Sequence, residues 1–160
     1  ALDVGANYWS LWTEAGNVAH YREKRPAAFD ALERRIGYRV RPSWVWQRKR
    51  AATDELVVAL ANDGAASVPG VLRVLAETRD GKPLAGGSLD AGHPFAGRLR
   101  LASFLLPPGL AGSEVRLRAE LEGKGVRRPV RWACAQPLDA ENALVVRLKK
   151  HDEPDWRKGV

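Results

Sequence analysis

The hydrophobic pattern before residue 37 has the spacing of an α-helix. Three apolar residues in this part of the chain fall three and four positions apart, namely Phe29, Leu32 and Ile36. Pro26 suits the first turn of a helix, and Gly37 suits its C-terminal end. We therefore predict a helix over residues 26–36. A shorter helix is expected just before it, with Asn17 as its N-terminal cap.

From Tyr38 onward the pattern has a period of two, which is typical of β-strands. Eight strands are predicted, over residues 38–46, 55–62, 70–78, 86–91, 97–105, 113–122, 127–136 and 143–149. They are separated by turn-forming segments such as 62–64, 80–83, 107–109 and 123–125. Many short strands with such turns favour a mainly β fold, an antiparallel immunoglobulin-like β-sandwich. The single cysteine, Cys134, excludes the immunoglobulin disulfide, so the likeness is one of architecture only.

Alternation also predicts which side chains form the core of the sandwich. The expected core residues are Leu56, Val58, Leu60, Leu99, Leu101, Val115, Leu117, Ala119, Leu121, Val130, Trp132 and Cys134, with Phe104 joining them after a slip or bulge. Cys134 is interpreted as a small apolar side chain rather than a reactive thiol.

The first residues of the chain do not fit the sandwich. The segment ANYWSLWTEA, residues 6–15, has apolar and aromatic residues on both sides of a predicted strand, a pattern typical of strands that are covered on both faces. We expect residues 1–37 to be a strand–helix segment of a larger unit, followed by a β-sandwich over 38–150 and a polar tail over 151–160. The absence of methionine leads to the same expectation, that the chain is part of a longer polypeptide.

The net charge of +7 comes entirely from the residues after 36. Residues 1–36 contain five basic and five acidic residues, whereas the rest of the chain contains 21 basic and 14 acidic ones. A basic domain can bind nucleic acid or another anionic polymer. Most arginines here alternate with apolar residues along strands, however, which favours the solvated face of a sheet over a nucleic-acid site. No run of residues is long and apolar enough to span a membrane.

Common catalytic and metal-binding patterns are weak in this sequence. The histidines His20, His93 and His151 lack metal-ligand spacing, and no metal or cofactor is expected. Asp80 and Asp90 are candidates for a calcium loop, but an Asp-Gly pair such as 80–81 is typical of a hairpin turn, and the turn interpretation is favoured.

Aromatic residues next to polar ones form the most informative cluster, at residues 7–14. Tyr8, Trp9 and Trp12 offer flat rings that stack on sugars, and Asn7 and Glu14 offer groups that bind hydroxyls. The sequence Tyr-Trp-Ser-Leu-Trp followed by a helix resembles the last strand and helix of a TIM-barrel glycoside hydrolase. The segments 37–40, 61–64 and 107–110 resemble parts of the C-terminal β-sandwich that follows the barrel in bacterial proteins of that kind.

This resemblance implies that Trp12, Trp9, Glu14 and Asn7 contact substrate at the C-terminal end of the last barrel strand. Glycoside hydrolysis needs two carboxylates about 5–10 Å apart, and in the resembled barrels they come from earlier strands. We therefore expect no catalytic residue and no catalysis by this chain alone, although the parent protein would be a glycoside hydrolase. A periplasmic or secreted parent follows only from that resemblance.

Three functions remain open from the sequence. The favoured one is a non-catalytic accessory sandwich that packs on the missing barrel portion of the same polypeptide and stabilises it. The alternatives are a carbohydrate-binding module and a basic interaction module for nucleic acid or an acidic polymer. Trp44 and Trp46 with the basic run 48–50 form an aromatic and basic patch that fits either alternative. Alternation places both tryptophans on one side, where contact with the sandwich core or the helix is favoured.

Overall fold

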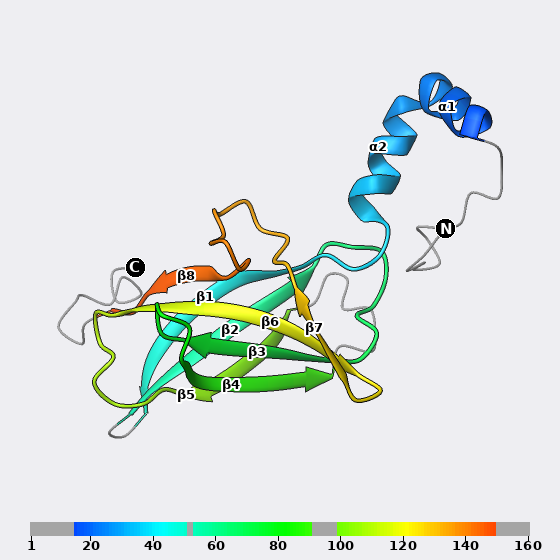
Figure 1. Cartoon of the computed structure of the whole chain (residues 1–160). Helices are drawn as coiled ribbons and strands as arrows, with labels where there is room; N and C mark the ends of the chain where they lie inside the picture. Colours follow the sequence, from blue (N-terminus) through cyan, green and yellow to red (C-terminus); the bar gives the residue numbers. More distant parts are fainter. Residues whose placement is uncertain (1–14, 51–52, 91–98, 150–160) are drawn as a thin grey trace.

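The computed structural model describes residues 15–50, 53–90 and 99–149. It shows two short helices followed by eight strands that form a mainly β, antiparallel sandwich (Figure 1). The elements are α1 (Ala15–Lys24), α2 (Pro26–Arg35), β1 (Val40–Arg50), β2 (Thr53–Asn62), β3 (Val71–Glu77), β4 (Pro83–Asp90), β5 (Arg100–Leu105), β6 (Glu114–Gly123), β7 (Val126–Val130) and β8 (Leu144–Arg147).

Two antiparallel sheets form the layers of the sandwich. The three-stranded sheet has the order β1-β2-β5, and the five-stranded sheet has the order β4-β3-β6-β7, with β8 pairing with β6. All eight predicted strands are therefore confirmed. One prediction was too long: the seventh strand ends at Val130, and residues 131–136 form no strand.

The core lies between the two sheets and is continuous. From β2 it takes Leu56, Val58 and Leu60, as predicted, and from β6 it takes Val115, Leu117 and Ala119. Trp132 lies in the segment after β7, is 2% exposed, and donates a hydrogen bond from its indole nitrogen to the Leu117 carbonyl oxygen at 2.8 Å. Cys134 is half-buried and packs against the edge of the core, in keeping with its interpretation as a small apolar side chain.

The prediction for β5 was wrong about which face enters the core. Leu99 and Leu101 are both more than half exposed, whereas Ala102 and Phe104 are buried. No slip occurs in this strand, because its register with β2 is regular from end to end. Ala102 lies opposite Val58, and side chains directly opposite in an antiparallel pair share a face.

The helices project from one end of the sandwich (Figure 1). They pack against one another and touch the strands very little. α2 starts at Pro26 and ends before Gly37, whose φ of 75° allows the chain to turn, so both signals were interpreted correctly. The prediction for α1 was wrong in one respect: Asn17 lies inside this helix and is not its cap. Neither described helix has the length and apolar character needed to cross a membrane.

A hydrogen-bonded joint ties the end of α2 to the loop after β2. We define this joint as residues 35–39 together with 62–66. The carbonyl oxygens of Arg35 and Gly37 accept hydrogen bonds from the backbone N–H groups of Ala65 and Ala66, at 2.7 and 3.0 Å. The buried Asn62 organises the loop. Its Oδ1 accepts hydrogen bonds from the N–H groups of residues 39 and 64, and its Nδ2 donates to the carbonyl of residue 66.

We expect Gly64→Ala to destabilise the joint by about 1–3 kcal/mol, the usual cost of overpacking. A Cβ at Gly64 would overlap the Gly37 carbonyl oxygen and lie 2.8 Å from the Tyr38 Cα, and backbone atoms cannot move aside as a flexible side chain would. Urea unfolding followed by circular dichroism measures the loss. Gly16→Ala in α1 is the control, since its new Cβ meets nothing within 4 Å. An equal effect of the two substitutions would contradict a tightly packed joint.

Candidate functional site

The substrate-contact residues predicted from the sequence, Asn7, Trp9, Trp12 and Glu14, lie outside the described residues. The predicted sugar platform therefore stays a prediction. The described chain begins directly after it, at α1, so the joint and the sandwich provide the geometry from which function can be argued.

Metal binding finds no support in the ranges that the structure describes. Within them, no three His, Cys, Asp or Glu side chains come together as a metal site would require. His20 lies on the exposed surface of α1, whereas His93 and His151 lie outside the described residues. Asp80 accepts a hydrogen bond from the Thr78 hydroxyl at 2.6 Å, which lowers the pKa of Asp80. Its carboxylate thus takes part in the β3–β4 hairpin turn.

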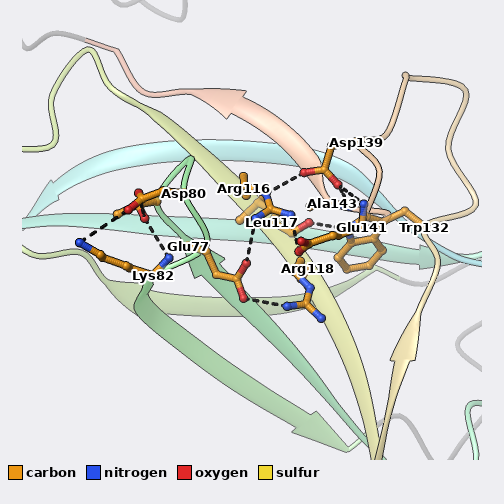
Figure 2. A network of polar contacts seen from close by, with 11 residues as sticks. Glu77, Asp80, Lys82, Arg116, Leu117, Arg118, Trp132, Asp139, Glu141 and Ala143 are labelled. Atoms are coloured by element: carbon orange, nitrogen blue, oxygen red, sulfur yellow. Dashed lines mark hydrogen bonds and ion pairs between the residues drawn. The ribbon is translucent and has the colours of Figure 1, made fainter.

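A network of charged side chains covers one end of the five-stranded sheet (Figure 2). Its centre is Arg116 on β6, which is 7% exposed. The Arg116 guanidinium donates hydrogen bonds to Asp139 at 2.7 Å and to Glu141 at 2.8 Å, both in the segment before β8. Its third nitrogen lies 3.7 Å from the buried Glu77 carboxylate on β3, and Arg118 donates to the same carboxylate at 3.1 Å.

The two guanidinium groups and three carboxylates of the network stabilise one another in their charged forms. Hydrogen bonds from the Arg116 guanidinium to Glu141 and Asp139 raise the pKa of Arg116. Burial raises the pKa of Asp139, but hydrogen bonds from Arg116 and from the backbone N–H groups of Ala143 and Glu141 outweigh it, so that its net pKa lies below 3.8. A shallow cavity of about 330 Å³ lies beside this network, and Arg79 and Glu114 on its wall pair with each other at 2.9 Å. The arrangement holds the segment before β8 against the sheet.

We expect the sandwich to lose stability as the pH falls through the acid range. Asp139 and Glu55 have pKa values lowered below 3.8 and 4.5 in the folded protein. For Glu55 the largest cause is the hydrogen bond from Arg48. A lowered carboxylate pKa stabilises the folded state above the unfolded-state value, and this contribution is lost as the pH falls through the folded-state value. The urea midpoint should therefore decline from about pH 4.5 downward.

Asp139→Asn tests the assignment of this pH dependence. The amide keeps the size of the side chain and cannot titrate. The variant should be less stable at neutral pH, and its urea midpoint should vary less between pH 5 and pH 3, values spanning the ordinary carboxylate range. An unchanged pH profile would mean that the network does not carry the titration.

The outer face of the five-stranded sheet presents a ladder of paired charges. Arg73 lies 3.5 Å from Glu122, and Arg127 donates to the same Glu122 carboxylate at 3.1 Å. Glu77 and Arg118 continue the ladder. The sequence predicted a solvated face for the arginines that alternate with apolar residues along β3 and β6. The prediction holds only in part, because Arg73 and Arg118 are partly exposed, whereas Arg116 is buried.

The outer face of the three-stranded sheet has the opposite character. It consists of the side chains that the strand register places on one side, namely Trp44 and Trp46 from β1, Val57 and Ala59 from β2, and Leu101, Ser103 and Leu105 from β5, and it ends at the pair of Arg48 and Glu55. We call this set the apolar outer face. Ala59 lies opposite both Trp44 and Leu101, and it is buried between them. Trp44, Leu101 and Leu105 are 59%, 57% and 53% exposed.

This surface corrects the interpretation of the two tryptophans. Trp44 and Trp46 do share a side, because their partners Ala59 and Val57 do. That side is the outer one, so Trp44 does not join the core. At the end of the face the buried Glu55 pairs with Arg48 at 2.7 Å and with Arg50 at 3.6 Å. One carboxylate between two guanidinium groups leaves that rim basic.

Sequence reasoning missed the apolar outer face as a surface, although a signal was present. β5 carries apolar residues on both of its sides, and so does β2. A strand that is apolar on both sides is covered on both in most folds. The same rule was applied to residues 6–15. For β2 and β5 it predicts that the outer side of the three-stranded sheet is apolar as well as the core side.

Comparison of the sequence with protein-family models and with curated proteins gives no match. The likeness to the C-terminal part of a glycoside-hydrolase-like protein therefore stays a prediction from its motifs, and the chain is assigned to no family.

Proposed function

We propose that this chain is the non-catalytic C-terminal β-sandwich of a glycoside-hydrolase-like protein, packing on the barrel and stabilising it. The observation that carries the proposal is the pair of helices, which has too few packing partners in the described structure to be stable alone. We take α1 and α2 as elements of the neighbouring barrel layer, joined rigidly to the sandwich.

The lengths and surroundings of the helices support this proposal. Each has ten residues, and isolated helices shorter than about 12–15 residues are marginal in water. The apolar stripe of α2 is only half-buried, and Tyr21 on α1 is 57% exposed. Helices in proteins gain most of their stability by burying an apolar face. The incompletely buried stripe fits a helix that packs on a barrel sheet.

The joint connects the two helices rigidly to the sandwich. Hydrogen bonds from the loop after β2 hold the last turn of α2, and Gly64 leaves no room for a side chain there. A rigid joint transmits the position of the helices to the sandwich, which a flexible linker would not. The charged residues of the five-stranded sheet fit a supporting role too, because arginines hold their carboxylates in place.

Amide hydrogen exchange on a longer polypeptide tests the proposal. The gene is extended upstream, and exchange in residues 15–36 is compared between the 160-residue chain and the longer product. We expect fast exchange in the short chain and strong protection in the long one, since packing on the barrel suppresses local unfolding. Equal exchange in both would refute the proposal, as would an upstream sequence with no repeated strand–helix pattern.

The alternative of a carbohydrate-binding module has one observation in its favour, the exposure of Trp44 on a sheet face. Aromatic rings on a flat surface stack on sugar rings. The strand register places Ala59 and then Leu101 beside Trp44, however, and the Glu55 carboxylate at the rim is engaged by Arg48 and Arg50. A glycan panel monitored by tryptophan fluorescence and melting temperature tests this alternative, and no response would remove it.

A further inference from the structure

Building on the proposed function, we infer that the apolar outer face of the three-stranded sheet is the surface on which the preceding domain of the same polypeptide docks. The interface would bury Trp44, Leu101 and Leu105, with the basic rim at Arg48 and Arg50 facing acidic groups on that domain. Such a contact adds a second attachment to the one made by the joint.

The contrast between the two outer faces of the sandwich is the first argument. On the outer face of the five-stranded sheet the charges are paired, and Arg73, Glu122 and Arg127 present such pairs to solvent. The three-stranded sheet presents the exposed Trp44 beside the half-buried Trp46, and two exposed leucines of β5 that are separated by Ser103. Leu99, just before β5, is exposed as well. Large apolar side chains that gather exposed on one face are typical of interaction sites.

The position of the apolar outer face along the chain indicates which partner docks on it. The end of α2 leads through the joint directly into β1, which is the edge strand carrying Trp44 and Trp46. At about 3.3 Å per residue, Trp44 lies roughly 13 Å along the strand from its start at Val40. The unit that contains the helices is therefore tethered within reach of the face, and such a tether gives it a high effective concentration there.

The charges at the rim agree with a protein partner. Protein interfaces combine an apolar centre with a polar rim, and complementary charges set their orientation. Here the apolar centre is bordered by Arg48 and Arg50, which share the single buried carboxylate of Glu55. The expected partner surface has an apolar centre of matching size and acidic residues beside it.

Cysteine labelling tests this docking directly. In a Cys134→Ser background, Leu101→Cys places one thiol on the apolar outer face, and Ser88→Cys places a matched thiol on the outer face of the five-stranded sheet. Ser88 is exposed and lies opposite Arg73, so it reports on the charged side. Labelling by a maleimide is timed in the 160-residue chain and in the polypeptide extended upstream.

We expect labelling at position 101 to be slower by roughly tenfold or more in the longer polypeptide, because a docked surface reacts only when it opens. Labelling at position 88 should not change. Equal rates at position 101 in both polypeptides would overturn the inference. Two results in the short chain would also overturn it. Protection of position 101 at higher protein concentration would indicate a second copy on this face, and protection on adding glycans would indicate a sugar site.

The failure of this inference can be told apart from that of the proposed function. If residues 15–36 gain exchange protection in the longer polypeptide while position 101 stays reactive, the helices belong to the barrel and the face does not. If neither changes, both ideas are wrong. Leu105→Lys gives a second readout: it should lower the melting temperature of the long polypeptide and leave that of the short chain nearly unchanged.

Discussion

Replacing Arg116 by methionine is expected to lower the free energy of unfolding by about 3–5 kcal/mol, the usual cost of removing one partner from a buried ion pair. The Glu77 carboxylate would stay buried with Arg118 as its remaining partner, and Asp139 would lose its 2.7 Å hydrogen bond. Methionine keeps much of the volume of the arginine side chain, so the loss reports on charge more than on a cavity. Urea unfolding at neutral pH measures it.

Two further variants make this prediction specific. Arg79→Met removes an exposed arginine that pairs with Glu114, and we expect little change, since exposed pairs contribute little to stability. Adding Glu77→Met to Arg116→Met should restore part of the loss, because the uncompensated buried charge is then gone. If Arg79→Met cost as much as Arg116→Met, burial of the network would not be the source of its stability.

Replacing Trp132 by alanine is expected to cost a similar amount, about 3–5 kcal/mol, through the cavity that the lost indole leaves. This tryptophan is almost fully buried, and its N–H group donates to the Leu117 carbonyl oxygen. Trp132→Phe separates the contribution of packing from that of the hydrogen bond. It keeps most of the packing but leaves the Leu117 carbonyl oxygen without its donor, and we expect this loss to cost about 1–3 kcal/mol. Thermal or urea unfolding gives the values.

Trp44→Ala is the matched control for the buried tryptophan. More than half of the Trp44 surface is exposed, so the stability of the 160-residue chain should change little. The two tryptophans also differ in fluorescence, because only the Trp132 indole lies in an apolar environment. Comparable losses for Trp44→Ala and Trp132→Ala would mean that the outer face stabilises the isolated chain, which would contradict its role as a docking surface.

Local sequence signals were sufficient for the elements of this fold. Pro26 and Gly37 marked the ends of α2 because one removes a backbone N–H and the other tolerates positive φ. The period of two marked the strands, and the turn residues between them were read correctly. Lys124 and Gly125, for example, both take positive φ in the β6–β7 hairpin. The seventh strand was predicted too long because apolar and polar residues keep alternating over residues 131–136, whereas the hydrogen-bonded pairing of β7 ends at Val130.

The candidate surface could be predicted only in part. Alternation placed Trp44 and Trp46 on one side of β1, and the register confirms this. It could not say which side, because both sides of a strand have the same period. β5 shows the same ambiguity: Leu101 and Leu105 compete with Ala102 and Phe104 for the core, and the leucines look more apolar in sequence.

The sequence by itself determined the mainly β class, the strands and their order along the chain, and the ends of α2, because propensity, turn chemistry and alternation act over a few residues. Only the tertiary structure decided which face of each strand is inside, because that depends on pairing between distant strands. The register of β5 on β2 turned Phe104 into the core and Leu101 outward. In the other sheet, the pairing of β3 with β6 placed Glu77 opposite Arg116, and the segment before β8 brought Asp139 to the same guanidinium.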